Sequence, residues 1–322
     1  MTEEPVAKER PAERISYGVF AAAERAAMVL PEFVGRRLFD VGGLAAFHLA
    51  SRARRVVEGN LSRVLGRDPG SPLLRAAAKD AFRSYARYWY DTFRIRVMPL
   101  DEFRSRMRFV GVENIERALE GGRGAVLALP HLGNWDAAGH WVAASGIRVT
   151  AVAELLRPER LFELFLHHRR ELGLGIVPLF DDRGVADELV KLIGENEVIA
   201  LVADRDIKGR GVEVEMFGEK RRMPAGPALL SLFTGSPLMP AACYDLEDGW
   251  TVVIGEPLEL EPSGVMRDDV TALTRLLAGR FERSIAAAPT QWHMFQPAWS
   301  PPAGEGEPAA APAATGIGAP SP

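Results

Sequence analysis

Two side chains suited to acid–base chemistry, His131 and Asp136, lie five positions apart, directly after an apolar run at 125–129. A neutral imidazole accepts a proton from a hydroxyl through one nitrogen, while a carboxylate on its other N–H fixes the tautomer. On a continuous helix, positions five apart diverge by about 140°. If the two side chains pair, His131 must precede a helix whose first turn holds Asp136. The spacing indicates a general base that activates a hydroxyl of the substrate.

The sequence offers no clear nucleophile of its own. It contains no Gly-x-Ser-x-Gly elbow, and its single cysteine, Cys243, lies in the apolar run 240–243. That context is typical of a small buried hydrophobe, and a lone cysteine forms no internal disulfide, which fits a reducing compartment. For an isolated pair the alternative is structural: Asp136 caps a helix and His131 satisfies a backbone group.

The elements that must position these residues alternate between short β-branched runs and helical segments. Strands are predicted at 125–129, 148–152, 198–202, 212–214, 237–240 and 251–254. Helices are predicted at 134–145, 158–172, 184–195, 225–235 and 267–287. This alternation predicts an α/β fold with a mixed, largely parallel central sheet flanked by helices. His131 then lies beyond the carboxyl end of a strand, where such sheets bind ligands.

The chain outside this α/β part differs in composition. Residues 14–100 have a helical pattern and 101–299 hold the α/β part with His131 and Asp136, so 14–299 are predicted to form one domain. Residues 1–13 and 300–322 lack the apolar surface to fold. The first 100 residues carry 17 Lys and Arg against 11 Asp and Glu. Apolar residues mixed with arginine at 33–55 predict an amphipathic helix on an anionic membrane surface, or a helical hairpin packed on the main domain.

Other features of the sequence narrow the range of possible functions further. The aromatic cluster at 82–93 is predicted to pack in the core or to line an acyl-chain groove. No apolar run reaches the ~18 residues of a membrane span, so membrane binding is expected to be peripheral. Phosphate-loop, dinucleotide and zinc motifs are absent, and we predict no metal, no cofactor and no nucleic-acid partner.

The segment His131-Leu132-Gly133-Asn134-Trp135-Asp136 resembles the His-x4-Asp motif of the glycerolipid acyltransferase superfamily, in the form found in bacterial lipid A late acyltransferases and actinobacterial phosphatidylinositol mannoside acyltransferases. Companion motifs follow in order at 153–155, 157–162, 169–173, 203–206, 223–227 and 291–299. The resemblance spans about 15–299, and the Trp-His-Met-x-Gln-Pro-x-Trp ending is most similar to the phosphatidylinositol mannoside acyltransferases.

The resemblance implies a fatty acyl-CoA such as palmitoyl-CoA as co-substrate and a mannosylated phosphatidylinositol as acceptor. The acyl group would pass to the 6-hydroxyl of a mannose at the cytoplasmic face of the plasma membrane. Two alternatives stay open. One is a lipid A-type or lysophospholipid acyltransferase with another acceptor, and the other is a non-catalytic lipid-binding protein that keeps the fold.

The resemblance also implies roles for the acidic residues and histidine of the catalytic centre. His131 would be the base and Asp136 its motif partner. Asp204 matches a second acidic position near the histidine, where some relatives use glutamate, so the sequence leaves open which carboxylate contacts His131. Oxyanion donors are expected from the backbone of 133–135 or from the turn 224–228.

The remaining implied site residues would bind substrate. Arg169 would contact the polar acceptor or an active-site carboxylate. Glu154 would bind a sugar hydroxyl, or be a surface charge. Arg205 and Asp206 would bind substrate, orient one another or form a strand-end salt bridge. His293 would organise the site.

Overall fold

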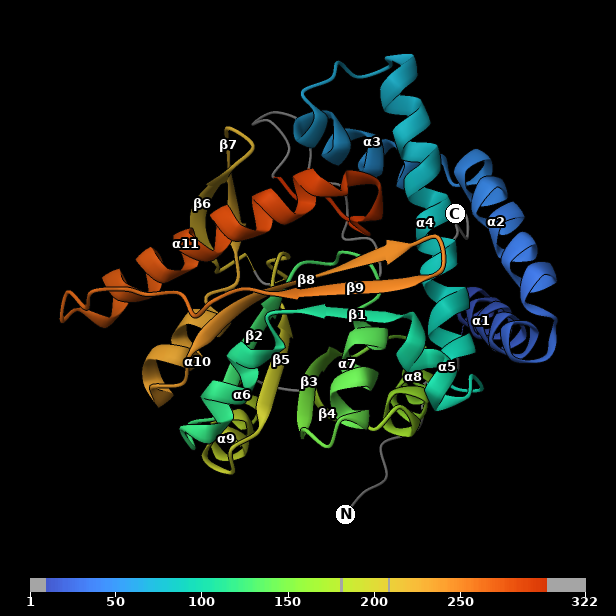
Figure 1. Cartoon of the computed structure of the whole chain (residues 1–322). Helices are drawn as coiled ribbons and strands as arrows, with labels where there is room; N and C mark the ends of the chain where they lie inside the picture. Colours follow the sequence, from blue (N-terminus) through green and yellow to red (C-terminus); the bar gives the residue numbers. More distant parts are fainter. Residues whose placement is uncertain (1–9, 180–181, 208, 300–322) are drawn as a thin grey trace.

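The computed structural model describes residues 10–179, 182–207 and 209–299, and its centre is a twisted sheet (Figure 1). Within the described residues this sheet has seven strands in the order β1-β9-β8-β2-β5-β3-β4. They are β1 (Met107–Val110), β2 (Ala125–Leu129), β3 (Val149–Glu154), β4 (Gly175–Leu179), β5 (Val198–Val202), β8 (Leu238–Leu246) and β9 (Gly249–Ile254). All neighbours are parallel except β8 and β9. The predicted fold class is confirmed.

Strand β2 lies in the middle of the sheet, hydrogen-bonded to β5 on one side and β8 on the other. All five of its residues are buried. Val126 and Ala128 join the core on one face, and Leu127 and Leu129 join the core on the other. A strand covered on both faces needs an unbroken apolar run, which explains the sequence of 125–129.

Helices cover both faces of the sheet. Their bounds are α5 (Leu100–Arg106), α6 (Val112–Glu120), α7 (Trp135–Ala144), α8 (Glu159–Glu171), α9 (Asp182–Gly194), α10 (Gly226–Thr234) and α11 (Met266–Ala287), followed by the 3-10 turn η1 (Pro289–Gln291). Helices α5, α6 and α7 contribute to one core cluster, and α9, α10 and α11 to the other.

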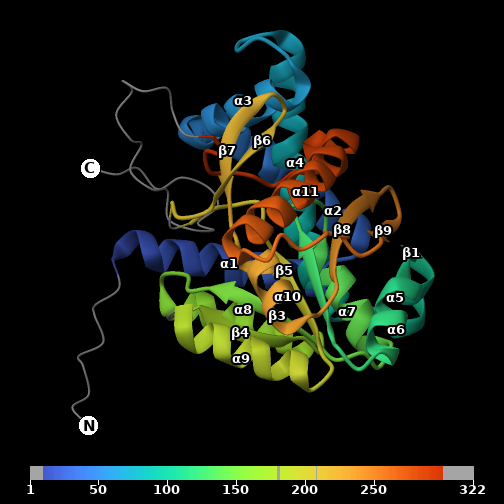
Figure 2. The same ribbon diagram turned by 90° about the vertical axis from the view of Figure 1, so that its left-hand side faces the viewer.

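The amino-terminal helices gather beside the sheet, with α4 in contact with the other three (Figures 1 and 2). They are α1 (Pro11–Val29), α2 (Glu32–Leu49), α3 (Ser51–Leu65) and α4 (Pro72–Ile95). Helix α2 packs on α4 but leaves Phe33, Leu38 and Leu49 exposed, so the predicted packed hairpin also has an apolar outer surface. Within the described residues no helix is both long and apolar enough to cross a membrane.

The structure also corrects several boundaries. Helix α1 begins at Pro11, where Glu13 accepts a hydrogen bond from the N–H of Arg10 at 2.7 Å, so part of the segment predicted as unfolded is helical. Residues 1–9 and the predicted tail 300–322 lie outside the described residues. Strands β1 and β4 were not predicted, nor was β7 (Glu219–Met223), which pairs with β6 (Val212–Met216). A proline at 178 in β4 and four charged residues in β7 mask their strand patterns.

Candidate active site

His131 lies in the turn between β2 and α7, at the carboxyl end of the sheet's middle strand. The turn presses against β8: Gly133 has φ of 59°, and a Cβ there would collide with the carbonyl of Cys243. Asn134 then caps α7 by accepting a hydrogen bond from the N–H of Ala137 at 2.9 Å. As the spacing requires, His131 precedes the helix and Asp136 lies in its first turn.

The carboxylate that contacts His131 is that of Asp204, not that of Asp136. Asp204 follows β5, the parallel neighbour of β2, so the two residues meet at one edge of the sheet. His131 Nδ1 lies 2.5 Å from Asp204 Oδ1, and the backbone N–H of His131 donates to Oδ2 at 3.0 Å. Because an ionised carboxylate only accepts, Nδ1 carries the proton and Nε2 is the basic nitrogen.

Asp204 is fully buried but ionised. Burial raises its pKa, yet the charge of a protonated His131 and hydrogen bonds from His131 and from the indole of Trp292 outweigh that effect and lower the pKa to about 2. The carboxylate therefore stays charged across the physiological range. It can hold the imidazole in one tautomer and stabilise the imidazolium once a proton is taken.

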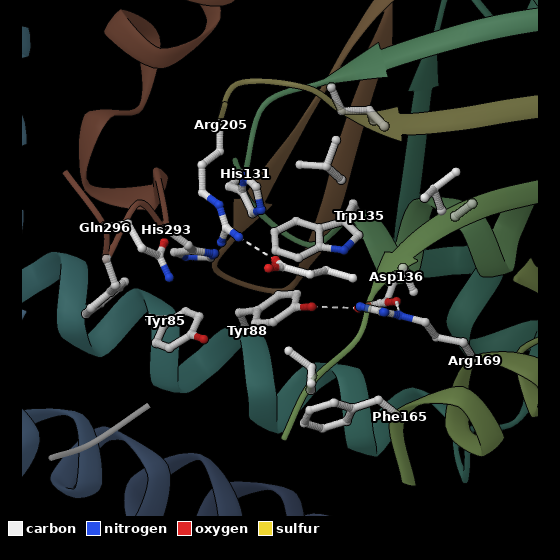
Figure 3. Close-up of a pocket in the computed structure, with 18 of the residues that line it drawn as sticks. Tyr85, Tyr88, His131, Trp135, Asp136, Phe165, Arg169, Arg205, His293 and Gln296 are labelled. Carbon is white, nitrogen blue, oxygen red and sulfur yellow. Dashed lines mark hydrogen bonds and ion pairs between the residues drawn. The ribbon is translucent and has the colours of Figure 1, made fainter. Parts of the chain in front are cut away.

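Asp136 has other partners (Figure 3). Its carboxylate accepts hydrogen bonds from Arg169 Nε at 2.7 Å and from the Tyr88 hydroxyl at 2.6 Å. Burial raises the pKa of Asp136, but the charge of Arg169 and these hydrogen bonds lower it overall. Asp136 thus ties α7 to α8 and α4. Of the two contacts expected for Arg169, the structure shows the one to a carboxylate.

The predicted sugar ligands lie on neighbouring strand ends. Glu154 ends β3 and forms an ion pair with Arg205, which follows β5. Both line the same cavity as His131. Asp206 also lines it and accepts a hydrogen bond from the N–H of Gly211 at 2.7 Å. Glu154 is therefore not merely a surface charge, and the strand-end salt bridge of Arg205 faces the cavity.

The cavity that His131 lines has a volume of about 2070 Å³. Most of its wall is apolar. One part runs beneath α7 along the sheet, lined by Leu127, Ala138, Val142, Val149 and Ala151. Another part lies between α1, α2 and α4. From the predicted aromatic cluster Tyr85 and Trp89 line it, while Tyr88 and Phe93 are also core residues. The cluster therefore packs in the core and also lines the cavity, and its role in an acyl-chain groove stays a prediction.

A mostly apolar cavity with a histidine of fixed tautomer in its wall fits transfer chemistry on a lipid chain, and comparison with known proteins points the same way. Residues 11–300 match the family model of bacterial lipid A biosynthesis acyltransferases. The chain belongs to this family.

Named relatives agree with that membership. The chain is 39% identical over 284 residues to a phosphatidylinositol mannoside acyltransferase of Mycolicibacterium smegmatis, covering 87% of this chain and 90% of the relative. It is 40% identical over 286 residues to proteins of the same name from two strains of Mycobacterium tuberculosis, covering 87% of each chain. The family and these names support an acyltransferase.

Within this acyltransferase site the structure shows contacts that the sequence did not predict. The Tyr88 hydroxyl binds Asp136, and the Trp292 indole binds Asp204. His293 is buried, with Nε2 3.0 Å from the Ser84 hydroxyl, and burial together with the charge of His131 lowers its pKa to about 3. His293 is thus neutral, and its organising role stays a prediction. The only sequence signals were the aromatic cluster and the carboxyl-terminal motif.

The structure also limits which groups can act as oxyanion donors, as an enzyme nucleophile or as metal ligands. The N–H of Gly133 donates to the carbonyl of Gln291 at 3.0 Å, which removes it from the predicted oxyanion donors. The turn at 224–227 lines the cavity. Burial raises the pKa of the Cys243 thiol far above its usual value, so Cys243 stays a thiol and forms no thiolate. No cluster of metal-ligating side chains occurs among the described residues.

Proposed function

We propose that this acyltransferase moves a fatty acyl group from an acyl-CoA such as palmitoyl-CoA to the 6-hydroxyl of a mannose of phosphatidylinositol mannoside. The observation that carries the proposal is the His131–Asp204 pair at the wall of a cavity with a mostly apolar lining. The names of the relatives favour this acceptor over lipid A or a lysophospholipid.

The chemistry uses one base. His131 Nε2 takes the proton of the mannose hydroxyl, whose oxygen bonds to the thioester carbonyl carbon. The tetrahedral intermediate collapses as the C–S bond breaks, and the imidazolium returns its proton to the departing thiolate. Asp204 stays ionised and compensates the imidazolium between these steps. The products are the acylated mannose and free CoA.

The cavity lining supports separate positions for the acyl chain and the sugar. Its apolar part beneath α7 suits an acyl chain, because burying each methylene contributes about 0.8 kcal/mol. Glu154 and Arg205 offer charged hydrogen-bonding groups to sugar hydroxyls at the polar end. The exposed apolar residues of α1 and α2, among them Ile15, Phe33 and Leu38, suit peripheral binding to an anionic membrane surface, which we place at the cytoplasmic face of the plasma membrane.

The test is acyl transfer in vitro. Purified protein is incubated with palmitoyl-CoA and a mannosylated phosphatidylinositol, and thiol release and product mass are followed for wild type, His131→Ala and His167→Ala. His167 is exposed on α8 and serves as the matched control. We expect acylated mannolipid from wild type and His167→Ala, and none from His131→Ala. Thioester hydrolysis without transfer would contradict the proposed acceptor. Turnover that survives in His131→Ala would contradict the assignment of His131 as the base.

A further inference from the structure

The carboxyl-terminal motif runs along the catalytic turn. Leu132 and Trp292 form an antiparallel bridge, the N–H of Gly133 donates to the carbonyl of Gln291, and the N–H of His293 donates to the carbonyl of His131 at 2.7 Å. These backbone contacts put residues 291–293 and 131–133 in one short ribbon. The side chain of Trp292 is thereby fixed relative to the base.

Trp292 reaches the second member of the pair. Its indole N–H donates to Asp204 Oδ2 at 2.7 Å, and both side chains are buried. Oδ2 also accepts the backbone N–H of His131, while Oδ1 faces the imidazole. The guanidinium of Arg221, another buried group, donates to the backbone carbonyl of Asp204. Asp204 is therefore held from three directions.

We infer that Trp292 is a positioning residue for acyl transfer, an inference that rests on the proposed function. With Oδ2 occupied by two N–H donors, the carboxylate has one orientation, in which Oδ1 meets Nδ1–H of His131. Without the indole donor, a buried lone pair loses its partner and the carboxylate gains freedom to rotate away from the imidazole. Trp292 touches no reacting atom, so its effect must pass through Asp204.

Trp299 provides a matched control. Its ring lies in the same cluster, with the Trp292 and Trp299 centroids 6.1 Å apart and the Arg221 guanidinium 5.0 Å from the Trp299 ring. The Trp299 indole N–H, however, is buried with no hydrogen-bond partner in the described part of the chain. Trp292→Phe and Trp299→Phe thus remove the same atoms from one cluster, but only the first removes a donor to Asp204.

The kinetic readout separates positioning from folding. In Trp292→Phe we expect kcat per folded molecule to fall about 10- to 100-fold, with KM for both substrates within about two-fold of wild type. The pH profile of kcat/KM should also shift. Trp299→Phe should retain kcat within about two-fold. An unchanged kcat in folded Trp292→Phe, or an equal loss in Trp299→Phe, would overturn the inference.

A second readout does not depend on turnover. Indole ¹⁵N–¹H spectra of the wild type, with resonances assigned by through-bond triple-resonance experiments, should show a slowly exchanging Trp292 N–H that moves in Asp204→Asn, while the Trp299 N–H does not move. A Trp292 resonance indifferent to Asp204→Asn would overturn the inference, even if Trp292→Phe fails to fold. Absence of acyl transfer by the wild type would contradict the proposed function instead, and the spectra would still decide the contact.

Discussion

Replacing each buried aspartate of the site by asparagine should give two opposite signatures. In Asp204→Asn, the donors from His131 N and Trp292 both point at the Oδ2 position. They orient the amide so that its oxygen accepts from them and its NH₂ faces His131 Nδ1. Nδ1 must then accept, which moves the imidazole proton to Nε2. The nitrogen meant to take the substrate proton is blocked.

The same exchange at Asp136 changes no atom near the imidazole. It removes the charge that compensates Arg169, whose side chain is 23% exposed. Breaking a buried ion pair lowers the free energy of unfolding by about 3–5 kcal/mol. Because Arg169 is partly exposed, we expect Asp136→Asn to lower it by about 3 kcal/mol, the lower end of this range. Asp204→Asn, by contrast, should lower kcat on the order of 10³- to 10⁴-fold, the scale of a wrong tautomer.

The assay measures both quantities on both variants: kcat at saturating palmitoyl-CoA and acceptor, and unfolding free energy in urea. We expect Asp204→Asn to be nearly inactive and Asp136→Asn to be unstable but active per folded molecule. More than a tenth of wild-type kcat in Asp204→Asn would refute the tautomer argument. If Asp136→Asn were stable and as inactive as Asp204→Asn, Asp136 would have to take part in the chemistry.

Further expectations concern substrate, membrane and pH. Glu154→Gln, which weakens the ion pair with Arg205, should raise the acceptor KM several-fold with a smaller effect on kcat, measured by initial rates at fixed palmitoyl-CoA. Phe33→Ser on exposed α2 should weaken binding to anionic vesicles in a sedimentation assay without lowering Tm, and wild-type binding should decline as salt rises from about 50 to 500 mM. Burial and the nearby Asp91 raise the pKa of Asp245 to about 7, so the folded state holds a proton that the unfolded state has lost above about pH 4. The contribution of Asp245 to stability should therefore fall as pH rises from about 4 to 7. In urea unfolding, the stability of Asp245→Asn relative to wild type should accordingly be greater at pH 8 than at pH 5 by about 1 kcal/mol or more.

The sequence predicted the position of the base but not its partner. An apolar run followed by a histidine and a helix predicts that His131 lies at the carboxyl end of a strand, because strand and helix periodicities are local properties. Strand order is not local. Only the pairing of β5 with β2 brings Asp204 to within 2.5 Å of His131 from 73 positions away. The motif spacing favoured Asp136, whose side chain leaves the first turn of α7 toward α4 and α8.

The two carboxylates of the site show why motif membership alone does not assign a role. Asp136 is neutralised by Arg169, so its charge is already compensated before any substrate binds. Asp204 accepts only neutral N–H donors while His131 is unprotonated, and Arg221 reaches its backbone carbonyl instead of its carboxylate. The Asp204 carboxylate can therefore stabilise the imidazolium form of His131. An ion pair with a resident cation would weaken its stabilisation of the imidazolium. A base of this kind needs an oriented carboxylate that is not already in an ion pair with a resident cation, and of the two only Asp204 meets that condition.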